Sequence, residues 1–103
     1  MSIETKKQAI AEEILKHKVV LYMKGSKHAP QCGFSAQVAH ILNEAHIDYQ
    51  DRDVLSDPEL REAIKAYSDW PTIPQLYING EFIGGCDIVM ELARTGELQK
   101  HLA

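Results

Sequence analysis

The sequence predicts an α/β layer fold, a mixed four-stranded sheet flanked by helices, on three observations. Residues 19–23 (VVLYM) form a continuous apolar run rich in β-formers, which suits a strand buried on both faces. An amphipathic helical pattern over residues 33–45 leads to a shorter, more polar strand within residues 47–54, so these segments form a βαβ unit with parallel strands. Asn79-Gly80 then separates two further apolar runs and indicates a β-hairpin.

Helices are expected before, between and after these strands. The first ends near His17, and another is opened by Asp57 as N-cap and Pro58 in the first position. Asp87 is expected to cap a last helix, and Gly96 to end it before a short tail helix. The apolar positions expected on the buried faces, in chain order, are Ile10, Ile14, Phe34, Val38, Ile41, Leu42, Ala45, Leu60, Ile64, Tyr67, Ile88, Val89 and Leu92.

Length and composition predict one domain spanning residues 1–103, because 103 residues with 45% hydrophobic and 25% charged side chains fit a single core. The net charge of −4 disfavours nucleic-acid binding, and no apolar run approaches the roughly 20 residues of a membrane span. The charged segment 1–18 lacks the apolar stretch of a secretory signal and carries acidic residues that mitochondrial transit peptides avoid. With only two cysteines, we expect a cytoplasmic protein in a reducing compartment.

Cys32 is the candidate catalytic thiol and metal ligand. It follows a predicted loop, residues 24–31, and precedes the helix that begins near Gly33. The unpaired N–H groups and partial positive charge of a first helical turn stabilise a thiolate and lower its pKa, and Lys24 adds positive charge at the same sheet edge. A thiolate serves both as nucleophile and as metal ligand. The alternative, a buried inert cysteine, is disfavoured because few apolar residues surround Cys32.

Ser35 occupies the position at which a C-x-x-C redox site has its second cysteine. A serine cannot resolve a mixed disulfide, so thiol exchange at Cys32 would need an external thiol. The alternative for Ser35 is an ordinary hydroxyl in the first helical turn.

Residues 70–74 (WPTIP) precede a predicted strand and contain two prolines. Pro74 cannot donate a ladder hydrogen bond, so it is expected at the start or edge of that strand. If its peptide bond is cis, the backbone of Ile73 is free to pair with an extended peptide. The alternative is a plain rigid loop.

Residues 84–87 (GGCD) and Arg61 supply further candidate binding groups. Paired glycines allow a ligand to approach the backbone, and the N–H groups of the following helical turn can bind a carboxylate. Asp87 can pair with an ammonium group or act only as a cap. Cys86 is expected to be a small buried side chain rather than a nucleophile. Arg61 suits bidentate recognition of a carboxylate, although a solvated surface charge is the common alternative.

Taken together, these motifs resemble those of monothiol glutaredoxins of the CGFS type. The resemblance to the short, single-domain bacterial form covers essentially the whole chain and implies a thioredoxin fold with a glutathione groove. The matching segments are residues 24–26 (KGS), 30–35 (PQCGFS), 70–75 (WPTIPQ) and 84–87 (GGCD).

The resemblance also implies roles for individual residues. Lys24 and Arg61 would hold the glycine carboxylate of glutathione, and the Ile73 backbone would pair with its cysteinyl part. Cys86 and Asp87 would hold its γ-glutamyl end. Cys32 would ligate a [2Fe-2S] cluster. The chain departs from the family at Lys27, where a proline is usual, so we expect this loop to be more mobile here.

A [2Fe-2S] cluster takes four ligands, usually thiolates. One chain offers one suitable thiolate, so a homodimer in which each chain contributes Cys32 and one glutathione sulfur is the expected cluster form. The family also implies a BolA-like partner and iron–sulfur acceptor proteins. The expected function is therefore cluster carriage and transfer in redox or iron homeostasis. The alternatives are a glutathione-dependent thiol-disulfide oxidoreductase using one cysteine, with weak activity at most, and an adaptor that binds a BolA-like protein.

Overall fold

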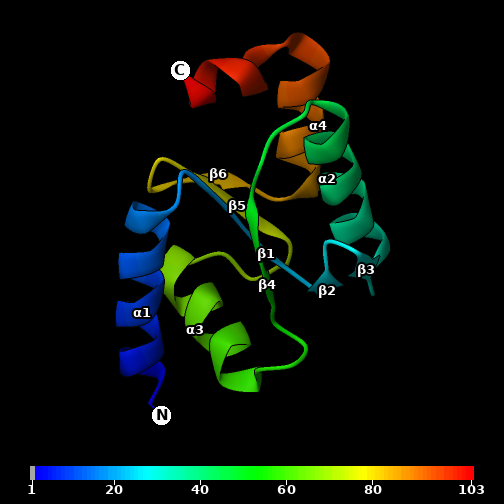
Figure 1. Ribbon diagram of the computed structural model, residues 1–103. Helices are drawn as coiled ribbons and strands as arrows, with labels where there is room; N and C mark the ends of the chain where they lie inside the picture. Colours follow the sequence, from blue (N-terminus) through cyan, green and yellow to red (C-terminus); the bar gives the residue numbers. More distant parts are fainter. Residues whose placement is uncertain (1) are drawn as a thin grey trace.

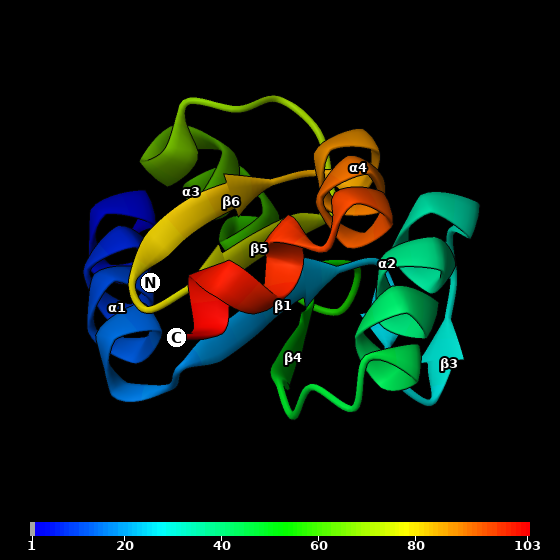
Figure 2. The ribbon, with the colours of Figure 1, turned by 90° about the horizontal axis from the view of Figure 1, so that it is seen from above.

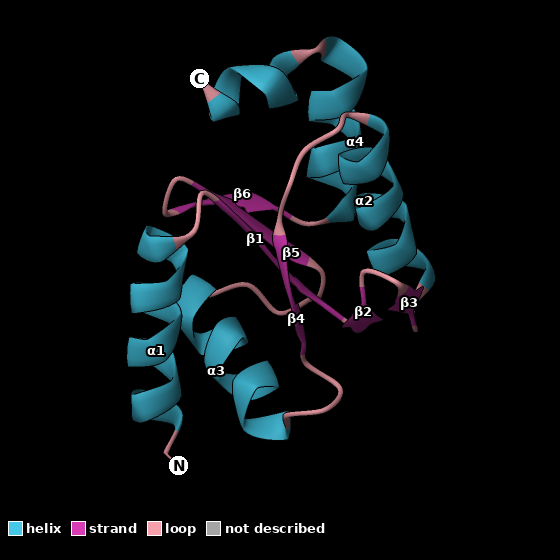
Figure 3. Cartoon of the chain, viewed as in Figure 1, coloured by secondary structure: helices cyan, strands magenta, loops and turns pink. Residues whose placement is uncertain are grey.

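The computed structural model describes residues 2–103, which form a four-stranded sheet between two layers of helices (Figures 1 and 3). Helices α1 and α3 lie on one side of the sheet, and α2 and α4 on the other (Figure 2). The elements are α1 (Ile3–Lys16), β1 (Val19–Met23), β2 (Gly25–Ser26), β3 (Ala29–Pro30), α2 (Gly33–Glu44), β4 (Gln50–Asp53), α3 (Pro58–Ser68), β5 (Gln75–Ile78), β6 (Glu81–Gly84), α4 (Cys86–Thr95) and η1 (Glu97–Leu102), a 3₁₀ helix.

The strand order in the sheet is β4-β1-β5-β6. Strand β1 pairs in parallel with β4, whereas the β1–β5 and β5–β6 pairs are antiparallel. The parallel pair, joined through α2, is the predicted βαβ unit, and the mixed sheet is confirmed. This arrangement is the thioredoxin fold that the family resemblance implies.

Strand β1 is buried along its whole length because both of its faces pack against helices. Val19, Leu21 and Met23 belong to the core beneath α2, α4 and η1. Val20 and Tyr22, which point the other way, belong to the core beneath α1 and α3. This alternation explains the continuous apolar run in the sequence, since a strand covered on both faces needs apolar side chains at every position.

The predicted hairpin at Asn79-Gly80 is confirmed. Both residues have positive φ, 53° and 80°, as a type I′ turn requires. Gly96 likewise adopts a left-handed conformation, ends α4 and begins η1, as predicted. Among the described residues, no helix is long and apolar enough to cross a membrane.

The start of α4 differs from the prediction. Gly85, with extended backbone angles, is the N-cap, and the chain is already helical at Cys86, so Asp87 lies inside the first turn and does not cap it. Asp57, in contrast, caps α3 as predicted: its carboxylate accepts the N–H of Leu60 at 3.1 Å. Asp87 is therefore left with its carboxylate exposed.

Two of the aromatic positions expected on buried helical faces are exposed. The Phe34 side chain is 61% exposed, and that of Tyr67 is 36% exposed. Phe34 lies in the first turn of α2, where its side chain lines an open groove. Tyr67 still contacts Tyr77, with ring centroids 6.2 Å apart, so it covers the edge of the core rather than filling it.

Candidate functional site

Cys32 is the N-cap of α2 and is partly exposed. The backbone N–H groups of Ser35 and Phe34, in the first turn of α2, favour its thiolate form, and the charge of Lys24 acts in the same direction. These contacts outweigh the effect of partial burial and lower the pKa of the Cys32 thiol. The structure therefore gives Cys32 the features of a reactive thiol, as the sequence predicted.

Ser35 has a structural role that sequence reasoning did not find. Its side chain is fully buried, and its hydroxyl oxygen accepts the backbone N–H of Lys24 at 3.0 Å. A backbone N–H buried without a partner is costly, so this bond favours a hydroxyl at position 35. The bond also joins the first turn of α2 to the chain just after β1, which places Lys24 beside Cys32.

A groove of about 390 Å³ opens beside Cys32. Its wall contains all five residues predicted to bind glutathione, although they come from separate parts of the chain. Cys32 is not itself part of the lining, but its neighbours Lys24 and Phe34 are. The lining residues are Lys24, Phe34, Arg61, Trp70, Pro71, Thr72, Ile73, Pro74, Gly85, Cys86, Asp87 and Ile88.

The charged residues of the groove come from both layers of helices. Arg61 lies on α3, beneath one face of the sheet, and Asp87 lies on α4, above the other. Both side chains are exposed, and within residues 2–103 neither of them, nor Lys24, forms an ion pair. The groove thus offers two cationic groups and one anionic group to a ligand that carries both kinds of charge.

The loop of residues 70–74 forms the middle of the groove wall. The Ile73–Pro74 peptide bond is cis, as the sequence analysis considered. In the part of the chain that the structure describes, the Ile73 backbone makes no hydrogen bond. It is therefore available to pair with an extended ligand, in the way an added strand would pair.

Cys86 is buried, as predicted, with 7% of its surface exposed. Its thiol donates to Oε1 of Gln37 at 3.3 Å, and its sulfur lies 3.7 Å from that of Met90. Burial raises the pKa of the Cys86 thiol, and the negative charges of Asp87 and of a Cys32 thiolate raise it further. The two cysteines therefore differ in kind: Cys32 favours the thiolate and Cys86 favours the neutral thiol.

The loop before Cys32 is anchored, contrary to the mobility expected from Lys27. Residues 24–31 contain a small hairpin formed by β2 and β3, where the composition predicted only a loop. The backbone N–H of Lys27 donates to Asp51 at 2.8 Å. The Lys27 ammonium donates to the carbonyl of Tyr49 at 2.5 Å and lies 4.3 Å from the centroid of its ring. These contacts to β4 and the residue before it restrain the loop without a proline.

The structure adds lining residues that the sequence did not assign to a site. Phe34 and Ile88 were predicted as core positions, yet they are exposed and lie in the groove wall. Thr72 also lines the groove. Their place in the first turn of a helix gives no signal by itself, since Ser35 and Cys86 lie in the same two helical turns and are buried.

The fold is of the thioredoxin type, and a thiol of lowered pKa lies at the start of a helix beside a groove that contains a cis-proline. These features are typical of proteins that use a cysteine thiolate for redox exchange or as a ligand. The glutaredoxin family model matches residues 19–83. The chain belongs to the glutaredoxin family, and it is similar to members that are named monothiol glutaredoxins.

Two curated relatives illustrate the similarity. A probable monothiol glutaredoxin 2 from Rickettsia conorii is 58% identical over 93 residues, which covers 90% of this chain and 87% of the relative. A monothiol glutaredoxin ycf64-like protein from Synechocystis is 53% identical over 102 residues, which covers 99% and 94% of the two chains. The solution structure of reduced apo GrxS14 from poplar superimposes with a TM-score of 0.81 at 48% identity, covering 93% of this chain and 88% of that one. Membership of this family implies the use of glutathione.

Proposed function

We propose that this protein binds glutathione in the groove and uses Cys32 to hold a [2Fe-2S] cluster that it passes to other proteins. The observation that carries the proposal is the position of the partly exposed Cys32 thiol, at the start of α2 and beside a groove lined by Lys24, Arg61 and Asp87. A thiolate is the form that binds iron, so a low pKa favours ligation at neutral pH.

The charges of the groove complement those of glutathione. Glutathione carries two carboxylates and one ammonium group. Lys24 and Arg61 would bind the glycine carboxylate, and Asp87 would pair with the ammonium of the γ-glutamyl end, beside Cys86. The free backbone of Ile73 would pair with the cysteinyl part, which directs the glutathione sulfur toward Cys32.

The ligand count supports a shared cluster. Within residues 2–103, no three His, Cys, Asp or Glu side chains come together in a way that could hold a metal ion. Cys86 is buried with a raised pKa, which leaves Cys32 as the thiolate suited to iron. Two chains and two glutathione molecules supply the four thiolates that a [2Fe-2S] cluster needs, so the cluster-bound form would be a homodimer.

The second candidate function is one-cysteine thiol-disulfide exchange, which the same low pKa favours. The Cys32 thiolate would attack a glutathione-containing disulfide, form a mixed disulfide and release the other sulfur as a thiolate. A second glutathione thiolate would then cleave the mixed disulfide, releasing oxidised glutathione and restoring Cys32. We rank this function second because the loop before Cys32 is longer than a minimal exchange site needs.

The proposal extends to location and partners. A cytoplasmic location, a BolA-like protein in place of the second chain, and iron–sulfur acceptor proteins all follow from the sequence and the family resemblance. The net charge of −4 disfavours a nucleic acid as partner.

Anaerobic reconstitution with iron, sulfide and glutathione, followed by native mass spectrometry, tests the proposal. The expected species contains two chains, two glutathiones, two irons and two sulfides, and removal of glutathione returns monomers. Cys32→Ser should abolish this species, while the matched variant Cys86→Ser should retain it. A cluster on a single chain, a dimer that keeps its cluster without glutathione, or cluster binding by Cys32→Ser would refute it.

A further inference from the structure

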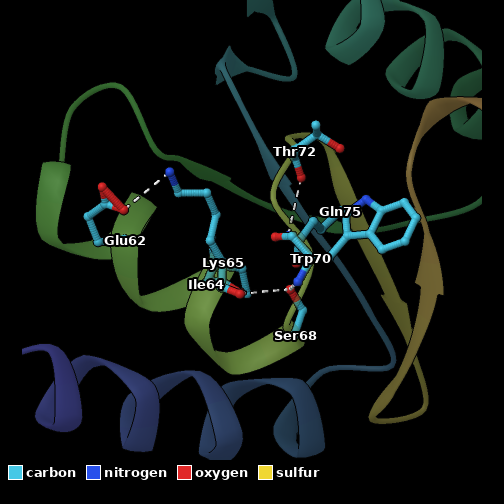
Figure 4. A network of polar contacts seen from close by, with 7 residues as sticks. All are labelled: Glu62, Ile64, Lys65, Ser68, Trp70, Thr72 and Gln75. Atoms are coloured by element: carbon cyan, nitrogen blue, oxygen red, sulfur yellow. Dashed lines mark hydrogen bonds and ion pairs between the residues drawn. The ribbon is translucent and has the colours of Figure 1, made fainter.

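Gln75 is a buried amide directly behind the groove. Its side chain is fully buried, one of two such polar side chains in residues 2–103, the other being Ser35. Its Nε2 group donates to the carbonyls of Trp70 at 3.1 Å and Thr72 at 3.2 Å (Figure 4). Its Oε1 accepts the hydroxyl of Tyr77 at 3.2 Å. Both amide N–H donors are thus directed at the loop of residues 70–74.

The loop of residues 70–74 has few backbone hydrogen-bond donors of its own. Pro71 and Pro74 have no N–H, so the loop lacks two of its backbone donors. At its start, the N–H of Trp70 donates to Oγ of Ser68 at 3.1 Å, and the Ser68 hydroxyl donates to the carbonyl of Ile64 at 2.9 Å (Figure 4). The carbonyls of Trp70 and Thr72 depend on the Gln75 amide for their hydrogen bonds.

The loop also touches the opposite wall of the groove. A Cβ atom added to Gly85 would lie 3.3 Å from the carbonyl oxygen of Pro74 and 3.7 Å from Nε1 of Trp70. On its other side, the Trp70 ring packs against Phe82, with centroids 6.0 Å apart. A shift of the loop would therefore change the groove width between Ile73 and the start of α4.

We propose that Gln75 is a positioning residue for glutathione binding. Its amide holds the carbonyls of Trp70 and Thr72, and thereby fixes the Ile73 backbone between them at the place where an extended ligand can pair with it. Gln75 does not line the groove and acts only through the loop. This inference rests on the proposed glutathione groove.

The test uses the cluster-free protein, reduced glutathione and the variant Gln75→Met, which keeps the side-chain length and removes the hydrogen bonds. Calorimetry should show a glutathione affinity roughly tenfold weaker, a change of about 1.4 kcal/mol. Trp70 is the single tryptophan of the chain, so its fluorescence reports on the loop, and the ligand-free spectrum should change. Ile78→Val, a small loss from the core on the other face of β5, is the control: it should lower stability while leaving affinity and fluorescence unchanged.

Gln75→Glu provides a second variant with a pH readout. Burial keeps the new carboxyl neutral at low pH, where it can donate one hydrogen bond to the loop, and ionisation at higher pH removes that donor. Relative to the wild type, its glutathione affinity should improve as the pH falls from about 9 to about 5, an interval that includes the raised pKa of roughly 8–9 that a buried Glu can reach. If Gln75→Met bound glutathione as tightly as the wild type, or if Gln75→Glu showed no pH dependence relative to the wild type, the role of Gln75 would be overturned while the proposed groove would stand. Failure of the wild type to bind glutathione would instead overturn the proposed groove and the inference with it.

Discussion

The buried hydroxyl oxygen of Ser35 accepts a hydrogen bond from the backbone N–H of Lys24 at 3.0 Å, which joins the first turn of α2, just after its N-cap Cys32, to the residue whose positive charge lowers the pKa of that thiol. The serine of the CGFS motif is therefore a structural link as well as the replacement of a resolving cysteine. This link relates the stability of the site to the reactivity of its thiol.

Ser35→Ala should lower both the stability of the protein and the reactivity of the Cys32 thiol. The Lys24 N–H loses its partner, which costs about 1–3 kcal/mol in unfolding free energy. The pKa of Cys32 should rise, because the Ser35 hydroxyl contributes to lowering it. Urea denaturation and the pH profile of alkylation by iodoacetamide measure the two effects. Ser56→Ala, which removes an exposed hydroxyl from the carbonyl of Asp53, is the control and should change neither appreciably. Unaltered stability and alkylation in Ser35→Ala would contradict the assigned link.

Lys24→Gln should raise the pKa of Cys32 without changing the first turn of α2. The positive charge of Lys24 lowers the thiol pKa, and a neutral amide removes that contribution. The alkylation midpoint should therefore move to higher pH, and the effect should shrink in high salt because the interaction is coulombic. Lys100→Gln, an exposed change in η1, should leave the midpoint in place. Coincident profiles for wild type and Lys24→Gln would show that the helix N–H groups act alone.

The stability of the folded protein should depend on the ionisation of Cys32. Because folding lowers the pKa of this thiol from its ordinary value of 9.0, the unfolded chain binds more protons between the two values. Stability should therefore rise with pH through that interval and fall as the pH drops through the folded pKa. Cys86, whose pKa folding raises, acts with the opposite sign above 9.0. Denaturant midpoints between about pH 6 and pH 9, measured in a Cys86→Ser background, should lose this rise when Cys32 is changed to Ser. A slope that persists there would assign it to another group.

Gly25→Ala and Gly33→Ala form a matched pair at either end of the loop before α2. Gly25 has φ of +90°, and an added Cβ would lie 2.5 Å from the carbonyl oxygen of Ala29, so the substitution should destabilise by at least about 1–2 kcal/mol. Gly33 has nothing within 4 Å of an added Cβ and is the first residue of α2, so alanine there should be neutral or slightly stabilising. Thermal denaturation of the two variants checks the contrast. Equal melting midpoints would show that the hairpin of β2 and β3 can shift enough to accommodate a Cβ atom at residue 25.

Arg61→Gln and Asp87→Asn should each weaken glutathione binding while leaving the fold intact. A hydrogen bond to a charged group contributes roughly 1.5–3 kcal/mol, and the exposure of both side chains places the expected loss at the low end. Calorimetric titration with glutathione measures it. Arg94→Gln, which removes an exposed charge paired with Glu91 on the same helix as Asp87, should bind like the wild type. Wild-type affinity in both groove variants would remove this groove from the proposed function.

The sequence by itself determined the parts of the protein that follow from local rules. The apolar run of residues 19–23 has one stable use, as a strand covered on both faces, and Asn79-Gly80 permits the left-handed turn that a tight hairpin needs. Asp57 followed by Pro58 begins a helix wherever that helix lies. The position of Cys32 at a helix start, and hence its lowered pKa, follows from the same local reasoning because the nearest backbone N–H groups come from the next three residues.

Tertiary structure decided the features that depend on what lies across the sheet. Arg61 and Asp87 line the same groove although their helices lie on opposite faces of the sheet, and the periodicity of the sequence cannot predict this placement. The ring of Phe34 fits the spacing of a buried stripe but is exposed, because it faces the groove that distant segments of the chain form together. Lys27 is held by Asp51 and Tyr49, contacts formed with a segment more than twenty residues further along the chain. Local propensity sets where elements begin and end, whereas the packing of distant elements sets which side chains they expose and what those side chains contact.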